Sequence, residues 1–201
     1  MGQITFFDLN GIIQNFKCDT YVETGTGIGV SLEYALKFPF KKYYTIDIDK
    51  DLMESTKLRF DSSKISFING LSTESLKSIL PELEDSESVL FFLDAHLPGA
   101  DFHKMSYEES MKTYKEQSLP LDEELSIIKN YRKNKKDVIV IDDLQLYEEA
   151  EYQHKTWHFE KLQEELGLRK SSDFIESMFK DTHSINKYFA HQGYILLTPK
   201  Q

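Results

Sequence analysis

The clearest signal in the chain is Tyr21-Val22-Glu23-Thr24-Gly25-Thr26-Gly27-Ile28-Gly29, in which three glycines alternate with other residues directly after a strand-like run. Residues 30–38 have the apolar spacing of a helix, so the glycines occupy a strand-to-helix turn. Glycine lets the backbone of such a turn pass close to a ligand. The spacing is tighter than the Gly-x-Gly-x-x-Gly pattern of dinucleotide sites, and the acid ahead of it suits a cationic ligand. The segment predicts a nucleotide-sized binding site, although a simple tight connection uses the same residues.

A second strand-like run covers residues 43–49 and ends in acidic residues. Asp47 lies 22 positions beyond Gly25. In a βαβ unit, an acid about 20 residues after the glycine turn sits at the end of the second strand and accepts hydrogen bonds from both ribose hydroxyls. This pairing predicts a nucleoside site. The alternative is that Asp47 and Asp49 form a solvated strand end.

Strand-like and helix-like segments alternate along most of the chain. Such alternation predicts an α/β fold with a doubly wound, mostly parallel sheet. Two further β-rich runs joined through Gln192-Gly193 predict a terminal antiparallel hairpin, and therefore a reversed C-terminal strand. The expected strands lie near 19–24, 43–48, 65–68, 89–94, 137–142, 185–190 and 194–198.

The fourth and fifth apolar runs both end in acids, namely Asp94 after the fourth run and Asp142 and Asp143 after the fifth. Because the carboxyl ends of parallel strands form the ligand crevice, we expect these three residues to converge there. Two like charges about 4 Å apart repel by roughly 4 kcal/mol at an effective dielectric near 20. The trio therefore favours a hard divalent cation, with Mg²⁺ preferred and Mn²⁺ or Ca²⁺ as alternatives. Without a metal, Asp143 would be a helix N-cap and Asp94 a partner of loop amides.

His96 lies two residues after Asp94. An imidazole at this place can accept the proton of a metal-bound hydroxyl near neutral pH, which makes His96 and Asp94 the candidate catalytic residues. His96 can instead ligate the metal itself. The third interpretation is that His96 is a structural histidine, held by hydrogen bonds beneath the loop.

These motifs together resemble class I S-adenosylmethionine-dependent methyltransferases. Within them they resemble the metal-dependent O-methyltransferases, namely the catechol type and the sugar and antibiotic O-methyltransferases of the cephalosporin-hydroxylase type. The resemblance runs from about residue 19 to 199 and is weakest over 144–182. It implies a Rossmann-like sheet of seven strands, S-adenosyl-L-methionine as cofactor, and a metal bound by the acids after the fourth and fifth strands. Carried over by position, the cofactor residues are Glu23 near the methionine ammonium, Gly25, Thr26, Gly27, Gly29, Asp47, Ile48, Ser72 and Asp94.

One departure from the catechol enzymes concerns the general base. Those enzymes have a lysine shortly after the fourth-strand acid, whereas Leu97-Pro98-Gly99 follows His96 here. The sequence therefore does not identify the general base of the reaction. The resemblance implies that the cofactor methyl group points toward the fourth and fifth strand ends, where the cation holds the acceptor oxygen in line.

Length and charge limit the other function classes. The 201 residues are expected to form one domain, residues 1–201, and 40% hydrophobic residues can fill its core. A net charge of −10 disfavours duplex nucleic acid as a partner. A single cysteine fits a reducing compartment, and neither a signal peptide nor a membrane-length apolar run is evident, so a cytoplasmic protein without membrane attachment is expected. Association into a homo-oligomer stays open.

Two stretches, 97–119 and 144–182, resemble insertions that would form the pocket of a small hydroxylated acceptor of the sugar or natural-product type. Two alternatives to a methyltransferase remain: an NAD-dependent dehydrogenase, which shares the glycine turn and ribose acid, and a non-catalytic methyltransferase-like binding module. Of the residues in the second stretch, Trp157 and Phe159 also fit the core face of a helix. The aromatic and histidine residues of this stretch are Tyr147, Tyr152, His154, Trp157, His158 and Phe159.

Overall fold

The computed structural model describes residues 4–60, 63–154, 160–167 and 171–200. Its centre is a seven-stranded sheet in the order β3-β2-β1-β4-β5-β7-β6, in which only β7 runs against the others. The predicted α/β class, the mostly parallel sheet and the reversed C-terminal strand are thus confirmed. The strands are β1 (Thr20–Thr24), β2 (Lys42–Asp47), β3 (Ile65–Asn69), β4 (Val89–Leu93), β5 (Val138–Ile141), β6 (His183–Tyr188) and β7 (Tyr194–Pro199).

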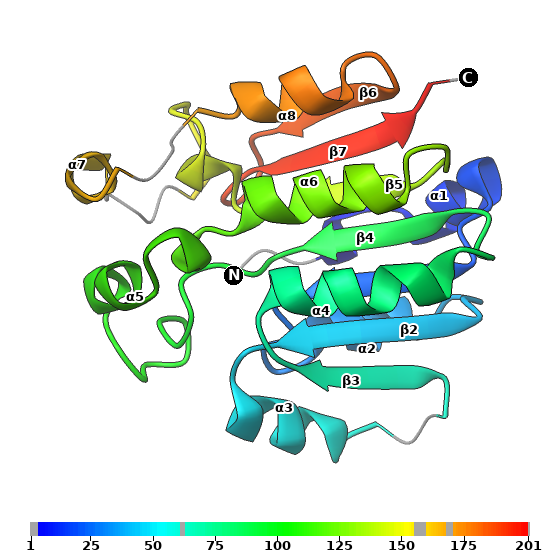
Figure 1. The fold of residues 1–201 in the computed structure, drawn as a ribbon, viewed down its shortest axis with the longest axis horizontal. Helices are drawn as coiled ribbons and strands as arrows, with labels where there is room; N and C mark the ends of the chain where they lie inside the picture. Colours follow the sequence, from blue (N-terminus) through cyan, green and yellow to red (C-terminus); the bar gives the residue numbers. More distant parts are fainter. Residues whose placement is uncertain (1–3, 61–62, 155–159, 168–170, 201) are drawn as a thin grey trace.

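Helices cover both faces of the sheet (Figure 1). The central strands β1, β4 and β5 are buried along their whole length, as expected for parallel strands between two helical layers. One core lies between the sheet and α4, α6 and α8, and the other lies between the sheet and α1 and α2. The helices are α1 (Leu9–Phe16), α2 (Val30–Ala35), α3 (Lys50–Lys57), α4 (Ser72–Ile79), α5 (Tyr107–Tyr114), α6 (Leu121–Tyr131), α7 (Glu160–Glu165) and α8 (Asp173–Phe179), with 3₁₀ turns at Ile4–Phe6, Leu80–Leu83, Lys115–Ser118 and Leu144–Leu146.

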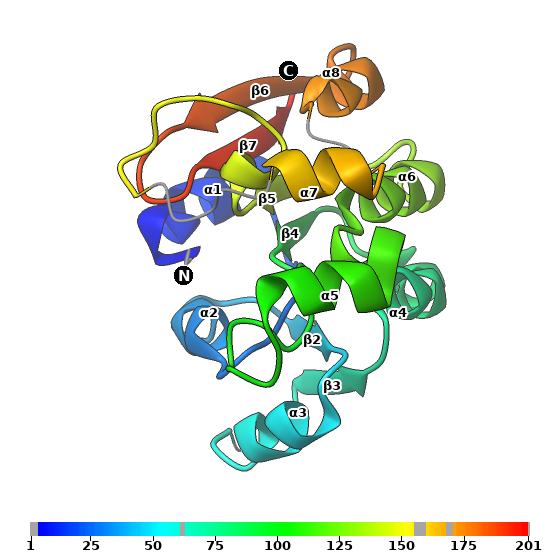
Figure 2. The ribbon, with the colours of Figure 1, turned by 90° about the vertical axis from the view of Figure 1, so that its left-hand side faces the viewer.

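The strand order reverses between β1 and β4, because the chain builds outward to β2 and β3 before it returns to β4. Open α/β sheets bind ligands at the carboxyl ends of the strands beside this switch point. Figure 2 looks onto that edge, which α5 and α7 flank. Of the aromatic and histidine residues expected near the acceptor, Trp157, His158 and Phe159 lie outside the described residues.

No helix in the described ranges has the length and apolar character needed to span a bilayer.

Candidate functional site

The turn between β1 and α2 allows an unusually close approach of main-chain atoms. Gly25 and Gly27 have φ of +80° and +51°, a left-handed conformation that residues with side chains rarely adopt. A side-chain carbon at Gly25 would lie 2.4 Å from the main-chain oxygen of Asp94, so the end of β1 passes directly against the end of β4. A side-chain carbon at Gly27 would lie 3.0 Å from the ring of Phe102. The turn therefore presents backbone to the space above the strands.

Asp47 holds this turn from the end of β2. Its carboxylate accepts hydrogen bonds from the main-chain N–H of Gly27 at 2.9 Å and of Asp49 at 2.8 Å. Burial raises the pKa of Asp47, and the two N–H groups oppose that rise. A carboxylate has about four acceptor positions, so Asp47 can still accept hydrogen bonds from a bound ligand.

Glu23 lies beneath the turn. Its carboxylate is 1% exposed and accepts hydrogen bonds from the Tyr21 hydroxyl at 2.8 Å and the Thr45 hydroxyl at 2.6 Å. Burial raises the pKa of Glu23 to about 7, against the effect of these two hydrogen bonds. Strand alternation explains the position, because residues 21 and 23 share the face that α1 and α2 cover. Within the described part of the chain, the residues that line the cavity described next do not include Glu23.

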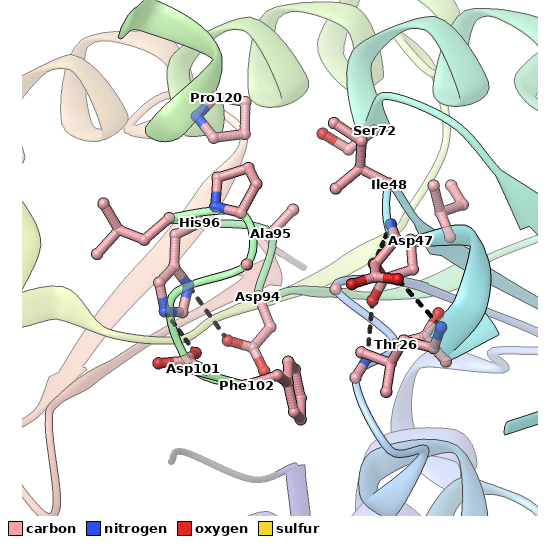
Figure 3. A pocket seen from close by; sticks show the side chains of 18 of the residues that line it. Thr26, Asp47, Ile48, Ser72, Asp94, Ala95, His96, Asp101, Phe102 and Pro120 are labelled. Atoms are coloured by element: carbon pink, nitrogen blue, oxygen red, sulfur yellow. Dashed lines mark hydrogen bonds and ion pairs between the residues drawn. The ribbon is translucent and has the colours of Figure 1, made fainter. Parts of the chain in front are cut away.

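A cavity of about 950 Å³, open to solvent on one side, lies at the carboxyl ends of β1, β2 and β4 (Figure 3). The glycine turn and Asp47 form one wall, and Asp94 and His96 form the opposite wall. Seven of the nine predicted cofactor residues line the cavity, namely Gly25, Thr26, Gly27, Asp47, Ile48, Ser72 and Asp94, whereas Glu23 and Gly29 do not.

His96 lies among three carboxylates on the second wall. Its Nε2 is 2.8 Å from Asp143 Oδ2 and 3.7 Å from Asp101 Oδ2, and its Nδ1 is 3.5 Å from Asp94 Oδ1. Burial lowers the pKa of His96, but the charge of Asp143, followed by that of Asp101, outweighs it and raises the pKa to about 9. Burial raises the pKa of Asp94, and the charges of Asp142 and Asp143 raise it further. The neighbouring carboxylates therefore favour the protonated form of His96, and its role as a proton acceptor stays a prediction.

The two acids after β5 point to different places. Asp143 has a φ of +53°, which turns it toward His96, while Asp142 Oδ1 accepts a hydrogen bond from the Asp143 N–H at 2.7 Å. Ligand atoms of Asp94, His96 and Asp143 lie within 4.8 Å of one another and form a group suited to a metal ion. Two of the three predicted acids, Asp94 and Asp143, thus belong to this group. His96 takes the third place, and Asp142 lies behind the group.

A loop after β4, residues 97–106, which we call the strap, crosses from the Asp94 wall to the Asp47 wall. Phe102 contributes to the cavity wall beside the glycine turn. Lys104 forms an ion pair with Asp49, the residue whose side chain caps α3, and lies 3.9 Å from Asp51. Non-glycine residues with positive φ occur at Leu97 (44°) and His103 (57°). Such strained residues often occur in ligand-binding loops.

The sequence predictions missed Asp101, Phe102 and Lys104, because a loop carries no periodic pattern that would fix its side chains. They also missed Glu124, which is 1% exposed in the first turn of α6. For Glu124 a signal was present, since helical spacing from the apolar Leu121 places position 124 on the buried face.

Comparison with known proteins gives structural matches but none from sequence: no family model and no curated protein matches this chain. The SAH-bound methyltransferase PaMTH1 of Podospora anserina superposes with a TM-score of 0.62 at 14% identity, over 95% of this chain and 76% of that one. A Staphylococcus aureus protein described provisionally as a caffeoyl-CoA O-methyltransferase gives 0.59 at 12% identity, over 100% and 85%. A SAM-dependent methyltransferase of Anabaena variabilis gives 0.53 at 12% identity, over 98% and 84%. The chain therefore has the fold of class I S-adenosylmethionine-dependent methyltransferases.

Proposed function

We propose that this protein is an S-adenosylmethionine-dependent methyltransferase that methylates a hydroxyl oxygen of a small acceptor with the help of a divalent cation. The observation that carries this proposal is that one cavity has two chemically different walls. The glycine turn and Asp47 on one wall suit a nucleoside. The Asp94 and His96 wall, with Asp143 behind it, suits a cation and the oxygen to be methylated.

The residues at the Asp94 wall fit a metal ion. Two carboxylates and one imidazole lie close together, and Asp143 Oδ1 is buried without a hydrogen-bond partner among the described residues. The carboxylate ligands suit Mg²⁺ or Mn²⁺, whereas an imidazole ligand is more usual for later first-row ions such as Zn²⁺. When bound, such an ion would lower the pKa of an acceptor hydroxyl and orient its oxygen. In this arrangement His96 is a ligand, and Asp101 stays near its ring as a further carboxylate.

The cavity also limits the chemistry of the acceptor. Its described lining residues include the acids Asp47, Asp49, Asp94 and Asp101, but no lysine or arginine. Away from a bound cation, a phosphorylated or carboxylated acceptor would meet like charge there. A neutral, hydroxylated acceptor of the sugar or natural-product type is therefore favoured. The sheet of the usual dinucleotide-binding dehydrogenases has six parallel strands, whereas β7 is antiparallel to its neighbours here. This difference disfavours a dehydrogenase.

Calorimetric titration with S-adenosylmethionine, S-adenosylhomocysteine and NAD, each with and without Mn²⁺, tests the cofactor. Micromolar binding of the first two ligands and no binding of NAD is expected. Binding of NAD alone would support a dehydrogenase, and binding of none of the three would contradict the proposal.

An assay of methyl transfer to a panel of hydroxylated acceptors tests the reaction. The measured quantity is the S-adenosylhomocysteine that is released. Cation assistance would be supported if EDTA and the Asp143→Asn substitution each abolish turnover. The surface variant Asp51→Asn should keep it. Cofactor binding without turnover on any acceptor would favour the binding module.

A further inference from the structure

A second, smaller cavity lies behind the Asp94–His96–Asp143 group. It has room for about one water molecule and is formed between the ends of β4 and β5, the start of α6 and the turn after β5. Its lining residues are Leu93, Asp94, Ala95, His96, Leu121, Glu124, Ile141, Asp142, Leu146 and Tyr147. The proposed reaction makes no use of Glu124 or Tyr147.

Two acids in this cavity, Glu124 and Asp142, are almost fully buried, with 1% and 3% of their surface exposed. Glu124 Oε1 and Asp142 Oδ2 are both shielded from solvent, and neither has a hydrogen-bond partner of good geometry in the described part of the chain. The Ser72 and Thr24 hydroxyls lie close enough to the Glu124 carboxyl to lower its pKa. Buried polar atoms of native proteins are nearly always paired, often through an ordered water. The two oxygens therefore indicate an occupant between them that donates hydrogen bonds.

We propose that Glu124 is a positioning residue for the candidate cation site, acting through one water in this cavity that joins Glu124 Oε1 to Asp142 Oδ2. The other oxygen of Asp142 accepts the Asp143 N–H at 2.7 Å, and Asp143 Oδ2 lies 2.8 Å from His96 Nε2. Glu124 thus connects α6 with the group that would hold the cation. This role rests on the proposed function as far as the cation is concerned, whereas the water itself does not depend on it.

The backbone of Asp143 shows why such support matters. Its φ of +53° is uncommon for a residue with a side chain and persists only where neighbouring groups hold it. The hydrogen bond that the Asp143 N–H donates to the Asp142 carboxylate supplies part of that support, so the orientation of Asp142 affects the direction of Asp143. Removing the group that fixes Asp142 should therefore disorder a cation ligand while leaving the glycine turn unchanged.

The test uses the full chain and three variants. Glu124→Met keeps the side-chain volume but removes both oxygens, and Glu124→Gln keeps hydrogen-bonding capacity. Glu123→Gln is the matched control, since Glu123 lies in the same helical turn with a side chain 54% exposed. Mn²⁺ binding is followed by electron paramagnetic resonance, S-adenosylhomocysteine binding by calorimetry, and folding by circular dichroism.

Glu124→Met is expected to weaken Mn²⁺ binding by about 10- to 100-fold, the usual effect of losing a residue that orients a metal ligand. Glu124→Gln should recover affinity to within about threefold of the wild type, as expected when a hydrogen bond is kept. Glu123→Gln should match the wild type, and S-adenosylhomocysteine affinity should change little in all three variants. A folded Glu124→Met protein that binds Mn²⁺ like the wild type would overturn the proposal.

A high-resolution crystal structure of the wild type decides the water directly. Density for a water within hydrogen-bond distance of both Glu124 and Asp142 is expected, and an empty cavity would overturn the proposal even if Glu124→Met fails to fold. Binding of S-adenosylhomocysteine without any binding of Mn²⁺ would refute cation assistance and with it the positioning role of Glu124, and the crystal structure would still decide whether the water is present.

Discussion

The Asp47 carboxylate on β2 accepts a hydrogen bond from the main-chain N–H of Gly27 at 2.9 Å. The acid that would bind the ribose is therefore fixed to the turn over which the rest of the ligand would lie. A bound nucleoside would meet both groups in a prearranged geometry, and prearrangement reduces the entropy lost on binding.

Replacement of Asp47 by alanine should greatly weaken S-adenosylhomocysteine binding. Two hydrogen bonds to a charged acceptor contribute about 1.5–3 kcal/mol each, so a loss of at least a hundredfold in Kd is expected. The matched control is Asp51→Asn, because Asp51 lies nearby with a side chain 92% exposed. Calorimetry provides the measurement. If Asp47→Ala bound the ligand within threefold of the wild type, Asp47 would not be the ribose acid.

Gly25→Ala should destabilise the protein more than Gly167→Ala does. Both residues have positive φ, at +80° and +68°, but a side-chain carbon at Gly25 would lie 2.4 Å from the Asp94 main-chain oxygen, whereas one at Gly167 would meet no atom of the described residues within 4 Å. The backbone strain alone costs about 1 kcal/mol, and the added clash should bring the cost at Gly25 to about 3 kcal/mol. Urea unfolding of the two variants measures the difference. Equal losses would show that β1 and β4 can separate at this point.

The fold was predictable because its signals are local. Each apolar run is long enough for one strand, and helices covering both faces leave the central strands no polar side. The carboxyl edge then follows from the parallel order, which is why Asp47, Asp94 and His96 all reach one cavity. These assignments needed no knowledge of side-chain directions.

The finer geometry was not predictable, because it depends on those directions. The sequence shows that Asp142 and Asp143 are adjacent, but it does not show that only Asp143, with its left-handed backbone, joins Asp94 and His96 in the group of possible ligands. Glu23 precedes the glycines, yet alternation along β1 turns it toward the Tyr21 hydroxyl beneath the sheet. The Lys104 ion pair with Asp49 joins residues 55 positions apart, and no local pattern indicates such a contact.

The burial of Glu23 should make stability depend on pH. The pKa of Glu23 rises from an ordinary value of 4.5 to about 7 in the folded protein. The folded state therefore binds this proton more tightly, so the stabilising contribution is complete below pH 4.5 and is lost as the pH rises through 7. The shift corresponds to a change on the order of 3 kcal/mol.

Glu23→Gln isolates this contribution, because glutamine fills the same space without a charge. The free energy of unfolding of the variant, relative to the wild type, should increase between pH 5 and pH 8 when both are measured by urea unfolding. Glu54→Gln is the surface control, with a side chain 67% exposed, and it should follow the wild type at both pH values. A constant difference between Glu23→Gln and the wild type would show that Glu23 stays ionised in the folded protein.

Loss of the Lys104 ion pair should speed release of the bound cofactor. Lys104 joins the strap to Asp49, two residues after the ribose acid, and Phe102 on the same strap lines the cavity. Lys104→Met should therefore raise the dissociation rate of S-adenosylhomocysteine by about two- to fivefold, as expected for one exposed ion pair. Added salt should speed release from the wild type but have little effect on the variant, because it screens the same pair.

Stopped-flow displacement of S-adenosylhomocysteine measures these rates. Lys77→Met is the matched control, because Lys77 forms an ion pair with Glu123 at 2.8 Å and is similarly exposed, at 49% compared with 44% for Lys104. It should leave the dissociation rate unchanged. If Lys104→Met and Lys77→Met released the ligand equally fast, the strap would not restrain the cofactor. In that case, hydrogen exchange of residues 97–106 would be measured without ligand. Faster exchange in Lys104→Met would show that the ion pair orders the strap but does not retain the ligand. Unchanged exchange would show that the ion pair neither orders the strap nor retains the ligand.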